Sequence, residues 1–308
     1  MIVEDEKSYT YEDSLCYIAL GSFDGIHKGH LSLVHKVYQL AKKNKAISVV
    51  YTFSNHPRDI IKIGDKPKLL MDNKTKIEVL KKEGIDKVYF QKFSKEFMKY
   101  SPEEFIDFLS DIFNIKGFIV GFNYKFGYKN SGDTSLLQEI CNKKNYELYI
   151  LPPYMYKDKI VSSTRIREEI LKGNIEEGNI LLGRPYEISG KVIHGKQNGI
   201  KLGFPTANIE YDEKFIIPRN GVYYTNVLVN NKIYKGITNI GYNPTFNGNK
   251  ITVETNILDF NDNIYGCEIK LYFVEFLRYE KKFDSLDKLK EQLKRDKKVA
   301  EEKTYLHL

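Results

Sequence analysis

The residues best suited to chemistry lie in one short segment, residues 21–30, with the sequence G-S-F-D-G-I-H-K-G-H. An apolar run that predicts a buried strand precedes it, and a pattern that predicts an amphipathic helix follows it. At a glycine-rich turn between strand and helix, the backbone can approach phosphates closely and the helix N-terminus favours negative charge. His27 and His30 are three residues apart, so both can project from one face toward a bound phosphate. The segment therefore predicts nucleotide chemistry.

Two other interpretations of these histidines are weaker. Either histidine could be a helix cap or a packing residue, but two of them between glycines favour a functional role. A zinc site would need further ligands at suitable spacing. The other histidines nearby in the sequence are His35 and His56, and His35 falls on a different part of the predicted helix. Zinc is therefore not expected.

A second polar cluster, S-S-T-R-I-R at residues 162–167, precedes another predicted helix. Three hydroxyl groups and two guanidinium groups at a helix start form a dense set of donors for an anion. A simple N-cap is the competing interpretation, with Ser163 or Thr164 capping and Arg167 solvated. That interpretation explains one hydroxyl group but not the whole cluster.

A third segment, L-G-F-P-T-A-N at residues 202–208, has the ligand types that Mg²⁺ prefers. In an extended backbone positions i and i+2 point the same way, so Thr206 and Asn208 can both reach one cation through oxygen. A local turn closed by the hydroxyl or amide side chain is the competing interpretation.

The elements that must position these residues differ between the two parts of the chain. Up to about residue 182, short apolar runs alternate with helical patterns, which predicts an α/β domain with an open parallel sheet. One helix start is well marked, since Ser101, Pro102 and Glu104 form a predicted capping box with proline in the first turn. In such sheets ligands bind at the carboxyl ends of the strands, where residues 21–30 lie. The predicted strands are residues 17–20, 46–53, 87–91, 117–121 and 148–151.

From residue 186 to 278 the sequence is rich in β-branched and aromatic residues and is broken by turn signals. Closely spaced strands without helices predict a small antiparallel β-barrel. A terminal helix is expected over residues 285–302, with Leu286, Leu289 and Leu293 on one side. We place the domain boundary at residue 184, giving domains 1–183 and 184–308.

Composition limits the partners. The 308 residues are 42% hydrophobic, with a formal net charge of +7 that suits an anionic substrate. The sequence contains no basic cluster interleaved with aromatic residues, which is the pattern that would favour nucleic-acid binding. No apolar run approaches the ~20 residues that a membrane helix requires, and the acidic N-terminus is unlike a signal peptide. Three scattered cysteines favour neither a disulfide framework nor a metal site. We expect a cytoplasmic protein that does not bind nucleic acid or membranes.

The first two motifs, in this order, resemble the nucleotidylyltransferase superfamily, and within it the adenylyltransferase module of the bacterial bifunctional riboflavin kinase/FAD synthetases. T-F-S-N-H-P at residues 52–57 and V-G-F-N-Y-K-F-G at residues 120–127 resemble the flavin-side loops of that module. The resemblance implies a Rossmann-like nucleotidylyltransferase domain in which the FMN phosphate attacks the α-phosphorus of ATP and pyrophosphate leaves. Catalysis would then consist of positioning and charge stabilisation.

The resemblance also implies roles for individual residues. His27 and His30 would donate to the α-phosphate, and Arg165 would act with them as a catalytic residue. His56 and Asn123 would contact the flavin, although His56 could instead pack and Asp24 could simply cap its turn. The residues expected at ATP are Gly21, Phe23, Asp24, Gly29, Ser163 and Thr164, the last two together with Arg165 at the departing phosphates.

The second half resembles the riboflavin kinase module. The matching segments are G-K-V-I-H-G at residues 190–195, P-T-A-N at residues 205–208, G-V-Y at residues 221–223, N-I-G-Y-N-P-T-F at residues 239–246, V-E-T-N-I-L-D-F at residues 253–260 and F-L-R at residues 276–278. The resemblance implies that Glu254 is the general base for the ribityl 5′-hydroxyl and that Arg278 contacts flavin. It implies Mg²⁺ at Thr206 and Asn208, and ATP at Gly195, Gly199, Lys201, Gly203 and Thr206.

Two positions depart from the family pattern. Ile200 stands where the glycine-rich loop usually carries arginine, so phosphate charge must be neutralised by Lys196, Lys201 or Mg²⁺. A lysine is a point charge without the bidentate geometry of arginine. Asn256 stands where histidine is common. Neither change removes a residue to which we assign catalysis.

The resemblance implies riboflavin, FMN and ATP as substrates, and we expect a monomer or a weak homo-oligomer. Three other functions remain open. One module could have lost activity and become a structural partner, the chain could be a flavin or nucleotide sensor, or it could be another nucleotidylyltransferase with an unrelated barrel. Thr206 and Asn208 argue against the last of these.

Overall fold

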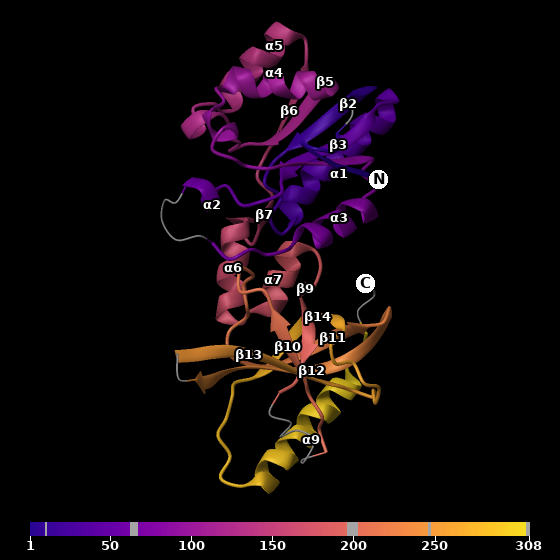
Figure 1. The fold of residues 1–308 in the computed structure, drawn as a ribbon, viewed down its shortest axis with the longest axis vertical. Coiled ribbons are helices and arrows are strands. Elements are labelled where there is room, and N and C mark those ends of the chain that lie inside the picture. The colour runs from indigo at the N-terminus through magenta and orange to yellow at the C-terminus, as the bar shows by residue number, and fades with distance from the viewer. Residues whose placement is uncertain (10, 62–66, 196–202, 246–247, 306–308) are drawn as a thin grey trace. The chain divides into compact units, whose positions relative to one another are not determined.

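The computed structural model describes residues 1–9, 11–61, 67–195, 203–245 and 248–305 (Figure 1). The chain forms two compact units: Met1–Pro67 with Met71–Ser162, and Lys68–Leu70 with Ser163–Leu308. This packing division precedes residue 184 because helices α6 (Ser163–Lys172) and α7 (Ile175–Leu182) belong to the second unit. Asn179 of α7 fixes this association, since its amide donates to the Phe273 carbonyl (2.8 Å) and accepts from the Tyr186 amide (2.7 Å). A functional boundary at residue 184 stays a prediction.

The first unit is built on a six-stranded sheet whose neighbouring strands are all parallel, as predicted. In spatial order the strands are β1 (Ile2–Asp5), β4 (Lys87–Gln91), β3 (Ile47–Phe53), β2 (Glu12–Leu20), β5 (Phe113–Gly121) and β6 (Glu147–Leu151). The helices of this unit are α1 (Lys28–Asn44), α2 (Arg58–Ile61), α3 (Asn73–Lys82), α4 (Pro102–Ile112) and α5 (Thr134–Lys144), and β7 (Met155–Tyr156) pairs with β8 (Lys159–Ile160).

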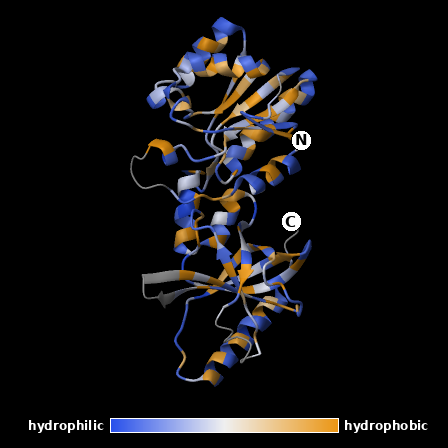
Figure 2. Cartoon of the chain, viewed as in Figure 1, coloured by the Kyte–Doolittle hydropathy of each residue, from blue (hydrophilic) through white to orange (hydrophobic). Residues whose placement is uncertain are grey.

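The central strand β2 is apolar on both faces because a core lies on each side of the sheet. Ile18 belongs to the same hydrophobic cluster as Leu109 of α4, whereas Tyr17 and Ala19 belong to the cluster of Val34 of α1. The central strands are correspondingly hydrophobic in Figure 2. The predicted capping box also forms, with Ser101 accepting from the Glu104 amide (3.1 Å) and the Glu104 carboxylate accepting from the Ser101 amide (2.7 Å).

Strand β1 is an element that the sequence pattern did not reveal, because its four residues are half acidic. It pairs in parallel with β4 at the edge of the sheet. The Lys87 ammonium group of β4 is 3% exposed and lies 3.1 Å from Glu4 of β1 and 2.9 Å from Glu12 of β2. Glu4 is therefore buried as the partner of a lysine, which hydrophobic periodicity cannot predict.

The strand order reverses between β2 and β5. From β2 the chain passes through α1 to β3 on one side, and from β5 it passes through α5 to β6 on the other. In doubly wound sheets the crevice at the carboxyl ends of such a strand pair receives the ligand. Residues 21–30 follow β2 and residue Asn123 follows β5, so two predicted site segments leave the sheet at this point.

The second unit contains the predicted antiparallel barrel, closed by six strands. Thr225, Thr238 and Thr255 are fully buried in it and are joined by hydroxyl hydrogen bonds of 2.8 and 3.0 Å, which satisfies these polar groups. Around the barrel the order is β10 (Ala207–Tyr211), β13 (Gly248–Ile257), β12 (Lys232–Thr245), β11 (Gly221–Val229), β14 (Glu268–Arg278) and β9 (Tyr186–Ile193).

The terminal helix α9 (Leu286–Glu302) forms as predicted, with Ser285 as its N-cap. Its predicted apolar side is wrong at Leu286, which is 70% exposed. The residue that reaches the core is Ala300, which packs in a cluster with Tyr224 and Ile237 of the barrel. None of the described helices combines the length and the apolar character needed to cross a membrane.

Candidate active sites

The turn after β2 is folded around buried side chains. Phe23 and Ile26 are fully buried, and both have positive φ angles, +49° and +35°. Such angles are strained for residues other than glycine, and strain of this kind persists only where the surrounding structure imposes it. Gly21 fits because a Cβ atom there would lie 3.1 Å from the Phe23 ring. With these apolar side chains turned inward, the backbone of the turn lies at the carboxyl end of the sheet.

The structure brings His27 and His30 together at the start of α1. Their rings stack with centroids 3.8 Å apart, and His27 is only 6% exposed. His27 is the N-cap, its Nδ1 atom accepting from the His30 amide (3.3 Å). In a neutral imidazole an accepting Nδ1 leaves the proton on Nε2, so His27 has a donor there. Gly29 makes room for this ring, because a Cβ atom at residue 29 would lie 3.1 Å from it.

The predicted flavin-side residues Asn123 and His56 differ in exposure and in their contacts. Asn123 is exposed immediately after β5, as a ligand-contacting residue requires. His56 is half-buried, and its Nδ1 atom accepts from the Arg58 amide (3.1 Å) at the beginning of α2. A local turn-stabilising role therefore accounts for His56, and its flavin contact stays a prediction. Asp24, 8% exposed, lies in the turn itself.

Sequence reasoning missed Lys76 of α3, which is 5% exposed behind the turn. Its ammonium group donates to the Ser22 carbonyl (3.0 Å) and to the Thr52 hydroxyl (3.2 Å), and that hydroxyl donates to the same carbonyl (2.9 Å). Burial lowers the pKa of Lys76 from 10.5 to about 8, partly opposed by the negative charge of Asp24. The signal available in the sequence was the spacing of Lys76, four residues before Leu80, which places both side chains on the buried side of α3.

This pKa predicts a measurable pH dependence of stability. Between pH 8 and 10.5 the folded state has a neutral Lys76 while the unfolded state keeps its proton, so the free energy of unfolding rises with pH. Below pH 8 both states are protonated and the burial penalty is present in full. Relative to Lys76→Met, wild type should gain about 2 kcal/mol between pH 7.5 and 9.5. Urea unfolding of the first unit at a series of pH values measures this difference. If the free energy of unfolding changed with pH equally in wild type and Lys76→Met, the prediction would be contradicted. Lys82→Met, an exposed change on the same helix, should follow wild type.

The residues Ser163, Thr164 and Arg165 form the first turn of α6, in the second unit. Arg165 is 14% exposed, and its guanidinium group lies 3.1 Å from the Glu177 carboxylate of α7. The ion pair fixes the direction of the arginine side chain relative to the helix start. Thr164 is exposed and Ser163 half-buried, so the hydroxyl of Thr164 is accessible to an anion.

The structure groups three predicted kinase residues on the barrel. The Thr206 hydroxyl lies 3.4 Å from a Glu254 carboxylate oxygen, and Asn208 stands opposite Glu254 in the β10–β13 pairing. These side chains supply hydroxyl, carboxylate and amide oxygens, the hard ligands that suit Mg²⁺. Strand β12 pairs with the other edge of β13, and there Asn239 of β12 also stands opposite Glu254. The Asn239 amide donates to the Glu280 carboxylate (3.3 Å). Sequence reasoning assigned no role to Asn239.

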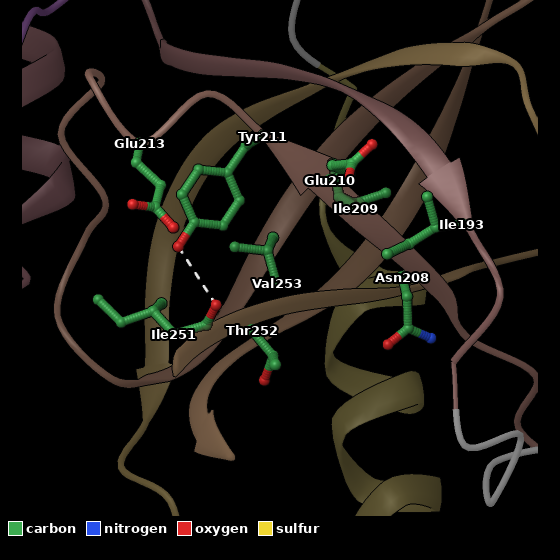
Figure 3. A pocket seen from close by; sticks show the side chains of 9 residues that line it. All are labelled: Ile193, Asn208, Ile209, Glu210, Tyr211, Glu213, Ile251, Thr252 and Val253. Carbon is green, nitrogen blue, oxygen red and sulfur yellow. Dashed lines mark hydrogen bonds between the residues drawn. The ribbon is translucent and has the colours of Figure 1, made fainter. Parts of the chain in front are cut away.

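A cavity of about 150 Å³ adjoins this cluster (Figure 3). Asn208 and Thr252 contribute polar side chains, and the Tyr211 hydroxyl donates to the Ile251 carbonyl (3.2 Å) beside them. The remaining lining residues are Ile193, Ile209, Glu210, Glu213 and Val253. The cavity therefore offers apolar surface next to the proposed cation ligand Asn208.

Gly195 is needed for the position of Asn208. A Cβ atom at residue 195 would lie 2.1 Å from the amide nitrogen of Asn208. We therefore expect Gly195→Ala to rotate this amide out of place and to lower riboflavin phosphorylation about 100-fold, since small misplacements can cost that much. Conversion of FMN to FAD should be unchanged in the same samples, and a normal rate of FMN formation would contradict the prediction.

Two further predicted positions have other partners in the structure. Arg278 forms a bidentate ion pair with Asp296 of α9 (2.7 Å at the closest approach) and also donates to the Tyr279 carbonyl. It thereby ties α9 to β14, and flavin contact stays a prediction. Asn256 donates to the Pro205 carbonyl (2.6 Å), which anchors the segment carrying Thr206. Gly203 has a φ of +79°, which requires glycine.

Lys196, Gly199, Ile200 and Lys201 lie outside the described residues. Within the part of the chain that the structure describes, no group of three or more histidine, cysteine, aspartate or glutamate side chains could hold a metal. The proposed cation ligands on the barrel are not a group of this kind, because two of the three, Thr206 and Asn208, are a hydroxyl and an amide residue.

Family models match both parts of the chain. The model described as FAD synthetase matches residues 10–165, and the model described as riboflavin kinase matches residues 182–304. Three curated relatives bear the name bifunctional riboflavin kinase/FMN adenylyltransferase. They come from Bacillus subtilis (34% identical, 94% of this chain and 92% of the relative), Buchnera aphidicola subsp. Schizaphis graminum (38%, 94% and 94%) and Escherichia coli K12 (32%, 93% and 92%).

A solved structure also covers nearly the whole chain. It is described as a macrolide-efflux protein from Streptococcus pneumoniae, with a TM-score of 0.90 and 33% identity over 99% of this chain and 100% of that one. The efflux activity in that description belongs to that protein. What the two chains share is the fold.

Proposed function

Because this chain belongs to the bifunctional riboflavin kinase/FMN adenylyltransferase family, we propose that it catalyses both reactions. It phosphorylates riboflavin to FMN with ATP and then adenylylates FMN to FAD with a second ATP. The observation that carries this proposal is that each unit builds its own polar cluster: stacked histidines at the strand switch in the first, and Thr206, Asn208 and Glu254 on the barrel in the second.

In the kinase step, Glu254 accepts the proton of the ribityl 5′-hydroxyl as that oxygen attacks the γ-phosphorus of ATP. The new P–O bond forms as the bond between the γ-phosphorus and the β,γ-bridging oxygen breaks, and ADP leaves. A carboxylate next to the Thr206 hydroxyl and opposite Asn208 is in a position to orient a hydroxyl nucleophile. Thr206 and Asn208 would hold Mg²⁺, which neutralises phosphate charge when bound. Gly195 leaves room for Asn208, and the cavity beside it accommodates part of a substrate.

In the adenylyl step, a phosphate oxygen of FMN attacks the α-phosphorus of ATP, a new P–O bond forms and pyrophosphate leaves. His27 and His30 donate to the α-phosphate oxygens, where charge develops. The Phe23 backbone would border the same phosphate, and the centroids of the Phe23 and His30 rings lie 5.2 Å apart. The family resemblance implies that Ser163, Thr164 and Arg165 would hold the departing pyrophosphate and that Asn123 would contact the flavin nucleotide.

A time course with riboflavin, ATP and Mg²⁺ tests the proposal. Riboflavin should disappear as FMN rises and then falls while FAD accumulates. If FMN accumulated and no FAD formed, only the kinase activity would remain. If riboflavin were not consumed but added FMN were converted to FAD, only the adenylyltransferase activity would remain. Tight FMN binding without ATP turnover would instead identify a sensor.

A further inference from the structure

The turn that carries the histidines is held from behind by one buried cation. The Lys76 ammonium group and the Thr52 hydroxyl both donate to the Ser22 carbonyl oxygen, at 3.0 and 2.9 Å. Lys76 and Thr52 also contact each other, at 3.2 Å. These three groups come from α3, β3 and the turn, so the contact ties one helix and one strand of the first unit to the candidate site.

The direction of the Ser22 carbonyl determines the direction of the next amide. In a planar trans peptide the carbonyl and the N–H of the following residue point to opposite sides, and none of the described residues, Ser22 and Phe23 included, is joined by a cis peptide bond. Since the Ser22 carbonyl points inward to Lys76, the Phe23 N–H points the other way. That amide makes no hydrogen bond to any other residue that the structure describes.

The conformation around this peptide needs such support. Phe23 adopts a φ of +49°, and a residue in this region is held there only where its surroundings impose it. Burying the Lys76 side chain at this position also costs free energy of folding. It is 5% exposed, and a charged group buried to this extent costs stability that an apolar side chain of similar length would not. Packing alone therefore does not account for a lysine here.

We propose that Lys76 is a positioning residue for adenylyl transfer, holding the Ser22–Phe23 peptide so that the Phe23 N–H donates to a non-bridging oxygen of the ATP α-phosphate. The inference rests on the proposed adenylyltransferase function of the turn. A preorganised backbone donor of this kind stabilises charge that develops in the transition state. Thr52 supports the same carbonyl, so it contributes a smaller share of the positioning.

The test compares Lys76→Met, Thr52→Val and Thr52→Ser in the full chain. Lys76→Met should lower kcat for FAD formation from FMN at least about 10-fold. This is smaller than the fall in kcat caused by removing an oxyanion donor altogether, because the Phe23 N–H would be displaced and not lost. Thr52→Val should lower it less, and Thr52→Ser, which restores the hydroxyl, should recover the wild-type rate. Riboflavin phosphorylation, measured in the same samples, should not change, and neither activity should change in Lys82→Met.

A second readout separates positioning from partial unfolding. With the Sp and Rp diastereomers of ATPαS, unfolding lowers kcat/KM for both equally, whereas a displaced donor changes their ratio. We expect Lys76→Met to change the ratio at least about fivefold. An unchanged ratio, or a kcat within twofold of wild type, would overturn the proposal. If His30→Ala loses FAD formation while Lys76→Met retains it, Lys76 alone is misassigned; if His30→Ala also retains it, the proposed function of the turn fails.

Discussion

Replacing Glu254 by glutamine should reduce FMN formation about 1,000-fold, because the amide cannot accept the proton of the attacking hydroxyl. Glutamine has the same shape, so the contact with Thr206 and the pairing opposite Asn208 should persist. The measurement is the rate of FMN formation from riboflavin and ATP, with FMN-to-FAD conversion in the same preparation as an internal control.

The matched control for this change is Glu275→Gln. Glu275 lies on strand β14 and is ion-paired with Lys303 at 2.6 Å. It is a carboxylate on the same barrel outside the proposed site, and its removal should leave FMN formation unchanged. Retained kinase activity in Glu254→Gln would remove this residue from the role of general base, and loss of both activities would point to misfolding.

Replacing His30 by alanine should reduce FAD formation from FMN at least about 100-fold, the usual value of one donor to a developing oxyanion. His30 stacks on His27 and packs near Phe23, so its loss also removes support from both. The measurement is pyrophosphate release with FMN and ATP. FMN formation from riboflavin should remain normal.

His35 provides the control for His30. It lies on the same helix, exposed, with its Nε2 atom 2.7 Å from Glu83. His35→Ala should leave both activities unchanged. FAD formation by His30→Ala at a near-normal rate would remove the histidine from the phosphate site.

The sequence predicted the elements well where burial follows a regular period. Strand β4 begins and ends where predicted, and the Ser101 capping box forms because both of its partners are local. Strand β1 was missed because its Glu4 is buried as the ion-pair partner of Lys87, which lies far away in the sequence. Leu286 was placed on the wrong side of its helix for a related reason: the buried face depends on which residues the barrel presents, and Ala300 meets them.

The site follows the same division. Spacing predicted His27 with His30 and Thr206 with Asn208, and the family resemblance implied Glu254. The structure brings each group together within its own unit. Lys76 and Asn239 were not predicted, because each acquires its partners only through folding. Arg278 and Asn256 were identified by motif, and the structure gives each a protein partner that the motif did not indicate.

The central claim is that one chain contains two separate active sites acting in sequence. The most direct measurement is FAD formation from riboflavin, ATP and Mg²⁺ by Glu254→Gln alone, His30→Ala alone and the two mixed. Neither variant alone should produce FAD, His30→Ala should accumulate FMN, and the mixture should restore FAD formation. If the mixture stays inactive although each variant keeps its remaining activity, or if either variant alone produces FAD at the wild-type rate, the assignment of the two reactions to these two sites is wrong.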